Sequence, residues 1–208
     1  MRITTILDQI DLGAVALPEF QRGYVWSRAQ VRGLMDSLYR RHPVGGLLIW
    51  KTQSADAAAR GDQPVQPGFV SLLLDGQQRI TSLYGLIRGE PPKFFEGNSN
   101  AFTDLRFNIE DETFEFYAPV KMRDDPKWID VTRVLKDGPG ELIGELTSAL
   151  GDHGHLGDYL TRIQRLHDIK EIDFHVDEVT GADKTVDVVV DIFNRVNSGG
   201  TKLSKGDL

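Results

Sequence analysis

The stretch from Asp75 to Arg79 carries the side chains and backbone groups best suited to chemistry, because an apolar run turns there into a helical pattern. The free N–H groups and the dipole of a helix N-terminus attract anions, and Gly76 lets the backbone approach a ligand closely. Arg79 offers a forked cation that matches phosphate geometry, and Gln77 and Gln78 can donate hydrogen bonds or orient a water. The stretch predicts a phosphate site. The alternative is that Asp75 only caps the helix and Arg79 is solvated.

A second stretch, Phe20 to Trp26, mixes aromatic residues with Gln21 and Arg22 directly before a helix. Arg22 is another cation for phosphate, and the ring of Tyr24 or Trp26 can stack on a base. For Phe20 and Trp26 we favour packing in the core, since Trp26 has the spacing of a hydrophobic staple. Gln21 and Arg22 are residue types that are usually exposed, so core packing does not explain them.

A third stretch runs from Phe193 to Thr201, and its Asn197-Ser198-Gly199-Gly200 follows a helix expected over Thr185–Val196. A polar, glycine-rich turn can wrap a ligand with its backbone N–H groups. The alternative is a plain helix C-cap, which would be preferred if this stretch stood alone. The pair His153 and His155 lacks an acidic partner at metal-helix spacing, so we predict no zinc site.

The elements that position these stretches follow from hydrophobic periodicity. A helix is expected over Ser27–Arg41, where Ser27 and Gln30 form a capping box. Buried strands are expected over Val44–Trp50 and Val70–Leu74, with a surface loop at 52–68 between them. The other expected elements are a helix over Gln77–Arg88, a hairpin of Leu105–Ile109 and Thr113–Tyr117, helices over Glu141–Leu150 and Leu156–His167, and a strand over Ile172–Val176.

Composition limits the class of protein. The chain has 208 residues, a formal net charge of -7 and no cysteine, which excludes disulfides and thiolate catalysis. No apolar run approaches the roughly 20 residues of a membrane span, so we expect a soluble, cytoplasmic protein. The charge is uneven: residues 1–93 hold 11 basic and 8 acidic residues, whereas 94–208 hold 13 and 23. The N-terminal half is therefore the half suited to an anionic ligand.

Taken together, the three stretches resemble a known family. Leu17–Trp26, Leu74–Leu83 and Phe193–Ser204 look like the motifs, in the same order, of the N-terminal domain of GmrSD-type restriction endonucleases, which anti-phage proteins of the GmrS, BrxU and SspE types share. The resemblance implies an α+β fold with a ParB/sulfiredoxin-like core. We expect that core over about 10–120 and a helical, closing part over about 121–208 of one domain. Ser204 and Asp207 look like the start of another helix, so we expect the 208 residues to be part of a longer protein; the alternative is a disordered tail.

The resemblance also implies a function and its residues. Members bind and hydrolyse GTP, UTP or CTP, sense modified foreign DNA, and commonly carry a following HNH-type nuclease domain. Carried over residue by residue, Asp75, Gln77, Gln78 and Arg79 would be catalytic. The nucleotide-binding residues would be Gln21, Arg22, Gly76, Asn197, Ser198, Gly199 and Gly200.

The leading hypothesis is a nucleoside triphosphatase that regulates a restriction nuclease. Mg²⁺ is expected, with Asp75 orienting the polar network or helping to hold the metal. The alternative is a non-catalytic module that senses modified DNA and partners a nuclease domain; a purely structural partner domain is a third option. Homo-oligomer formation stays open, and no membrane partner is expected.

Overall fold

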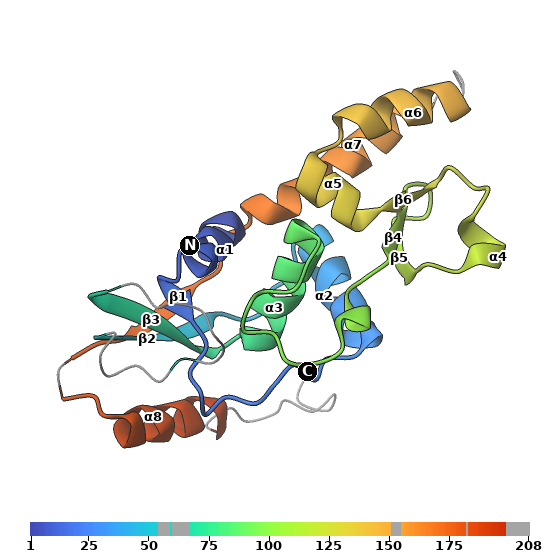
Figure 1. Ribbon diagram of the computed structural model, residues 1–208. Helices are drawn as coiled ribbons and strands as arrows, with labels where there is room; N and C mark the ends of the chain where they lie inside the picture. The colour runs from blue at the N-terminus through green and yellow to red at the C-terminus, as the bar shows by residue number, and fades with distance from the viewer. Residues whose placement is uncertain (54–58, 60–66, 151–154, 182, 199–208) are drawn as a thin grey trace, which may run out of the picture.

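The computed structural model describes residues 1–53, 59, 67–150, 155–181 and 183–198, and its fold is mixed α+β (Figure 1). The helices are α1 (Ile3–Asp11), α2 (Arg28–Tyr39), α3 (Gln77–Arg88), α4 (Pro119–Met122), α5 (Val131–Asp137), α6 (Gly140–Leu150), α7 (Leu156–His167) and α8 (Val186–Ser198), with 3₁₀ turns η2 (Ser99–Ala101) and η3 (Asp168–Glu171). The strands are β1 (Val15–Ala16), β2 (Leu47–Gln53), β3 (Phe69–Asp75), β4 (Leu105–Asn108), β5 (Thr113–Phe116), β6 (Trp128–Asp130) and β7 (Val176–Val179).

The larger sheet has the strand order β1-β3-β2-β7. The central pair, β2 and β3, is antiparallel, with Trp50 opposite Leu72, and both outer strands run parallel to their neighbours. Successive side chains of a strand point to opposite faces of the sheet. Leu47 and Ile49 therefore join one hydrophobic cluster and Leu48 and Trp50 the other. Burial on both faces explains why these strands have continuous apolar sequences.

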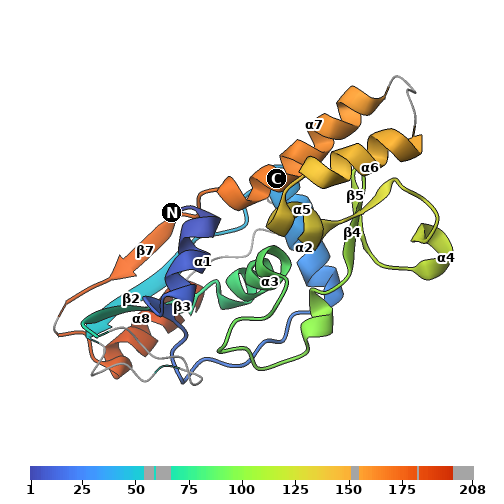
Figure 2. The same ribbon diagram turned by 45° about the horizontal axis from the view of Figure 1, so that its top comes forward.

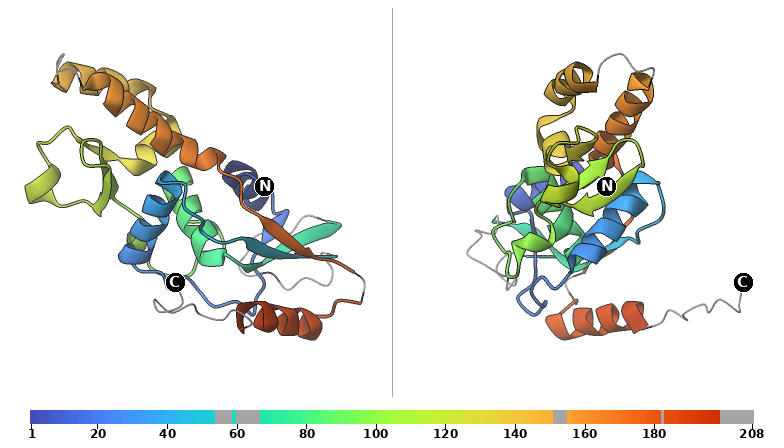
Figure 3. Two further views of the ribbon diagram at one scale, coloured as in Figure 1. Left: turned by 180° about the vertical axis from the view of Figure 1, so that it is seen from behind. Right: turned by 90° about the vertical axis from the view of Figure 1, so that its right-hand side faces the viewer.

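Helices cover the two faces of this sheet unequally. Helix α8 lies on one face, where Val189 is fully buried against the sheet (Figures 1 and 3). Helices α1, α2 and α3 contribute to the main core on the other face. Helix α3 begins one residue after the end of β3, so the end of a central strand and the start of a core helix are held together.

A second, three-stranded sheet has the order β5-β4-β6 and is antiparallel throughout. Helices α6 and α7 lie side by side beyond it, at the end of the molecule away from α8 (Figure 2). The rings of Phe107 and Phe114 pack with that of Tyr39 from α2 at centroid distances of 4.8 and 5.9 Å. This contact joins the second sheet to the main core. No helix within the described ranges is both long and apolar enough to cross a membrane.

Most predicted elements are confirmed, but several bounds are not. The helix expected over Ser27–Arg41 is α2, and the Ser27 N–H donates to Gln30 Oε1 at 2.9 Å, as a capping box requires. The predicted strand over Val44–Trp50 begins only at Leu47. The strand expected over Ile172–Val176 is displaced toward the C-terminus and forms as β7.

Side-chain burial corrects two further expectations. Phe20, expected in the core, is 44% exposed, whereas Trp26 packs against the core as its staple spacing indicates. Gln21, expected on the surface, is buried, because its side-chain amide has a backbone partner deep in the fold. The division into a core over 10–120 and a closing part over 121–208 stays a prediction; strand β7 of the latter joins the main sheet.

One glycine shows how tightly α3 packs. A Cβ added at Gly85 would lie 2.3 Å from the ring of Phe102, a fully buried aromatic residue. We expect Gly85→Ala to lower the free energy of unfolding by about 1–3 kcal/mol, the usual cost of overpacking a core. Urea denaturation of the variant and of the wild type measures this loss in the free energy of unfolding. The matched control is Gly33→Ala in α2, where a Cβ would meet nothing within 4 Å. Helix propensity predicts no loss there, and an equal loss in both variants would contradict the packing argument.

Candidate functional site

The predicted phosphate site is built on the junction of β3 and α3. Gly76 adopts a left-handed conformation, with φ 91°, and the first intrahelical hydrogen bond is Ile80 N to Gly76 O at 3.0 Å. A Cβ at Gly76 would lie 2.3 Å from Leu47 Cδ2, so only glycine fits this turn. No side chain of the described residues caps the helix start. The free N–H groups and the helix dipole therefore make this end of α3 suited to an anion.

The second predicted stretch packs directly on this junction. The Gln21 side-chain amide donates to Leu74 O at 2.8 Å, and the Gln77 side-chain amide donates to Arg22 O at 3.1 Å. These bonds join residues 53 and 55 positions apart in the sequence. The Arg22 side chain itself is exposed. Two of the three predicted motifs thus meet at one place, with a cation at its edge.

The Gln78 side chain is hydrogen-bonded to the backbone of the segment that precedes α2. Its Oε1 accepts from the backbone N–H groups of Val25 and Trp26, at 2.9 and 3.3 Å, and its amide donates to Gly23 O at 3.2 Å. Both ends of this buried side chain are therefore engaged. Gln78 holds the backbone of the second motif against the first turn of α3.

The Arg79 side chain is hydrogen-bonded to the loop before β2. Its Nη1 donates to Val44 O at 2.6 Å, and its Nη2 donates to Gly46 O at 2.7 Å and to Asp75 Oδ2 at 3.2 Å. Its side chain is 13% exposed, and the ring of Phe174 lies 6.0 Å from its guanidinium carbon. Burial lowers the pKa of Arg79, against the opposing effect of Asp75. Sequence reasoning missed the Val44–Gly46 loop as part of this site.

A polar and aromatic contact continues the site on the far side of α3. Tyr24 Oη and Ser82 Oγ are 2.8 Å apart, and the Ser82 hydroxyl donates to Gln78 O at 2.7 Å. Burial raises the pKa of Tyr24 to about 12, so this hydroxyl stays protonated at neutral pH. Its ring packs against Phe95 and Phe102 at 5.5 and 5.6 Å. Tyr24 thus packs in the core at this point, and stacking of its partly buried ring on a base stays a prediction.

The third predicted motif is only partly within the described residues. Helix α8 extends to Ser198, so the backbone of Asn197 and Ser198 is helical, where a turn was expected. Gly199 and Gly200 lie outside the described residues. Whether this motif closes over the α3 junction stays a prediction.

The described residues contain no cluster of three or more metal-ligating side chains. Asp75 is the carboxylate of the motif. Its side chain is 44% exposed and forms an ion pair with Arg79 at 3.2 Å. Mg²⁺ commonly uses one or two protein carboxylates together with substrate phosphates. The residues present therefore fit a metal that arrives with a nucleotide, and they do not form a pre-built protein cage.

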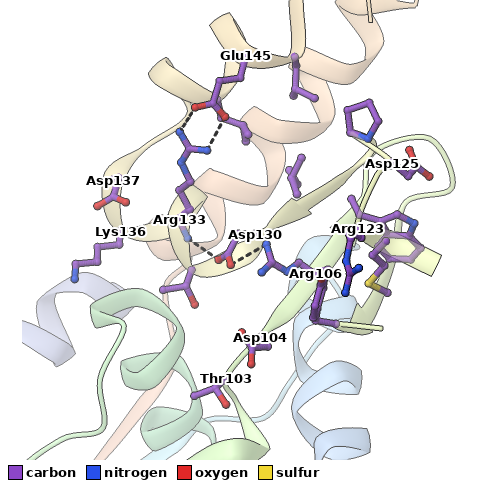
Figure 4. A pocket seen from close by; sticks show the side chains of 18 of the residues that line it. Thr103, Asp104, Arg106, Arg123, Asp125, Asp130, Arg133, Lys136, Asp137 and Glu145 are labelled. Carbon is purple, nitrogen blue, oxygen red and sulfur yellow. Dashed lines mark hydrogen bonds and ion pairs between the residues drawn. The ribbon is translucent and has the colours of Figure 1, made fainter. Parts of the chain in front are cut away.

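A larger hollow of ≈ 1260 Å³ lies between the three-stranded sheet and helices α5 and α6 (Figure 4). Arg106 pairs there with Asp130 at 3.0 Å, and Arg133 makes two 2.7 Å bonds to Glu145. These ion pairs engage two of the four cationic residues that line the hollow; Arg123 and Lys136 line it as well. None of the residues predicted from the sequence lines it, so it is separate from the α3 junction.

Comparison with known proteins gives two findings. A family model described as "GmrSD restriction endonuclease, N-terminal domain" matches residues 3–208. An uncharacterized protein of Methanocaldococcus jannaschii is 34% identical over 114 residues, which cover 48% of this chain and 19% of that protein.

Proposed function

The chain belongs to the family of N-terminal domains of GmrSD restriction endonucleases, and we propose that it binds and hydrolyses a nucleoside triphosphate at the start of α3. Membership in this family implies a role in defence by restriction of foreign DNA. The observation that carries the nucleotide proposal is the meeting of two motifs: Gln21 and Arg22 are hydrogen-bonded to the β3–α3 junction from more than 50 positions away.

Each part of the junction has a role in this proposal. The uncapped N–H groups of α3 receive a phosphate. Arg22, exposed at the edge, contacts the triphosphate, and Arg79 contributes positive charge while it holds the Val44–Gly46 loop. Mg²⁺ carried by the phosphates, with Asp75 as its protein ligand, would neutralise charge on the phosphates.

The finer features of the family are part of the same proposal. They are a ParB/sulfiredoxin-like core, closure of the site by Asn197, Ser198, Gly199 and Gly200, assembly into homo-oligomers, recognition of modified foreign DNA, and cooperation with a downstream HNH-type nuclease domain. The matched relative is about five times as long as the aligned part, so these properties concern the whole protein.

The direct test measures nucleotide binding by calorimetry and phosphate release with GTP, UTP and CTP. We expect at least one nucleotide to bind and to release inorganic phosphate. Absence of both with all three would overturn the proposal. Binding without phosphate release, together with selective gel shifts of modified duplexes, would instead favour the non-catalytic sensing module.

Arg22 gives a test that separates binding from folding. Its side chain is exposed, and within the described residues only its backbone carbonyl is hydrogen-bonded, so Arg22→Ala should leave the free energy of unfolding unchanged within about 0.5 kcal/mol. Loss of a charged contact to phosphate should weaken nucleotide binding roughly 10-fold or more. The matched control is Arg32→Ala, an exposed arginine on α2. Equal effects of the two variants on affinity would count against a specific role for Arg22.

A further inference from the structure

The second motif carries three aromatic rings, and the fold uses them differently. The ring of Tyr24 packs against those of Phe95 and Phe102, and Trp26 packs against the main core. Phe20 is 44% exposed, and its ring has no aromatic or cationic partner among the described residues. Apolar surface left in water forgoes the stabilisation that burial gives. Of the three rings, that of Phe20 is therefore the one most available to a ligand.

Phe20 lies beside the predicted phosphate site. The next residue, Gln21, is hydrogen-bonded through its side chain to the end of β3, and Arg22 O accepts from the Gln77 amide at 3.1 Å. The Gln21 N–H donates to Pro18 O at 3.1 Å, which closes a turn around Phe20. Because consecutive Cα atoms are about 3.8 Å apart, the Cα of Phe20 lies within about 8 Å of that of Arg22. The ring is thus held close to the start of α3.

The backbone donors that follow Arg22 are already used within the fold. Tyr24 N donates to Glu96 O at 2.7 Å, and the N–H groups of Val25 and Trp26 donate to Gln78 Oε1 at 2.9 and 3.3 Å. A base can be recognised by hydrogen bonds to its edges or by stacking on its face. Residues 24–26 keep no N–H group for a base edge, which leaves stacking as the contact that this segment can offer.

We propose that Phe20 stacks on the base of the nucleotide, while the phosphates lie at the start of α3 beside Arg22. This inference rests on the proposed function and adds the contact that recognises the nucleoside. In a nucleoside triphosphate the ribose and two phosphates separate the base from the terminal phosphate. A base contact therefore belongs at the edge of a phosphate site, which is where Phe20 lies. An aromatic ring accepts the face of any base, and a purine offers a larger face than a pyrimidine.

The test removes the ring of Phe20 and keeps an apolar side chain in its place. Calorimetry with Mg²⁺ measures the binding of non-hydrolysable analogues of GTP, UTP and CTP, and of inorganic tripolyphosphate, which has no base. We expect Phe20→Leu to weaken binding of the GTP analogue about 10-fold and that of tripolyphosphate by less than about 2-fold. The losses for the UTP and CTP analogues should lie between these values, because a pyrimidine stacks over a smaller area.

Phe69→Leu is the matched control. Phe69 is another exposed phenylalanine, at 73%, and it begins β3, whereas Asp75 ends this strand. Six residues of a strand separate the two positions by about 20 Å. The control should therefore bind all four probes with wild-type affinity, so a loss confined to Phe20→Leu is specific to the edge of the phosphate site.

Phe20→Trp gives a readout that a purely structural role would not produce. Indole offers a larger ring for stacking than phenyl, so this variant should bind the GTP analogue at least as tightly as wild type. Stacking of a base on the new indole should also quench its fluorescence. We expect the nucleotide analogues to quench the variant more than wild type, and tripolyphosphate to quench both equally.

The outcomes separate this inference from the proposed function. Failure of the wild-type chain to bind any of the three nucleotide analogues overturns both. Wild-type binding of the GTP analogue with an affinity of Phe20→Leu within about 2-fold of it overturns the role of Phe20 alone. Equal losses for the GTP analogue and tripolyphosphate do the same, since the base is then not what the ring contacts. If Phe20→Leu does not fold, absence of extra quenching in Phe20→Trp decides against the stacking contact.

Discussion

Gly76→Ala is expected to lower the free energy of unfolding by about 2–4 kcal/mol. Two effects combine. The left-handed backbone of Gly76, at φ 91°, costs an L-residue roughly 1–2 kcal/mol. The new Cβ would also lie 2.3 Å from Leu47 Cδ2, and overpacking a core costs about 1–3 kcal/mol. Because Leu47 begins β2, the displaced contact connects the turn to the main sheet.

Gly89→Ala is the matched control. Gly89 ends the same helix in the same left-handed conformation, at φ 80°, but a Cβ there would meet its nearest neighbour, Lys136 Nζ, only at 3.4 Å. The control therefore measures backbone strain with little steric conflict. Urea denaturation gives the loss in the free energy of unfolding for both variants, and the difference between the two losses is the cost of the steric clash. A loss in Gly76→Ala no larger than that in Gly89→Ala would contradict the assigned contact with Leu47.

The parts of the fold that the sequence could predict are those that depend on local patterns. Helices α2 and α3 and the β4–β5 hairpin follow from local periodicity and capping, and they are confirmed. Helix α1 carries an equally clear local pattern, with buried Ile3, Ile6, Leu7 and Ile10 at helical spacing, although it is not among the predicted elements. The two-residue strand β1 has too few residues for any periodic signal.

The site divides in a similar way. Residue types and the strand–turn–helix context identified the motif at Asp75–Arg79, since those signals are local. Apart from Asp75, four positions before Arg79, the partners of Gln78 and Arg79 could not be predicted. They are backbone atoms 33 to 55 positions away, such as those of Gly23, Val25 and Gly46. Backbone carbonyls and N–H groups occur at almost every position, so sequence does not show which of them a side chain will use.

The partners of Arg79 change what its removal should do. The sequence alone suggests that Arg79→Ala would abolish turnover and leave the fold intact. The structure adds a stability cost, because Val44 O and Gly46 O lose charged donors at 2.6 and 2.7 Å in a site where the side chain is 13% exposed. A buried acceptor left without a partner costs about 1–3 kcal/mol. Val44 and Gly46 are only partly buried, so water can replace part of the lost donors. We expect Arg79→Ala to lose about 1–3 kcal/mol in the free energy of unfolding.

Arg88→Ala, on the same helix, separates the two roles of Arg79. Arg88 also bonds two acidic residues, Asp8 at 2.5 Å and Asp11 at 3.0 Å, but these carboxylates are exposed, and surface ion pairs contribute only about 0–1 kcal/mol. The two variants and wild type are compared by urea denaturation and, at a temperature where all are folded, by phosphate release. Arg88→Ala should keep wild-type turnover and most of the stability. Arg79→Ala should lose turnover even while folded, since the Val44–Gly46 loop and Asp75 then lack the cation that holds them. Folded Arg79→Ala with wild-type turnover would show that this arginine serves the fold alone.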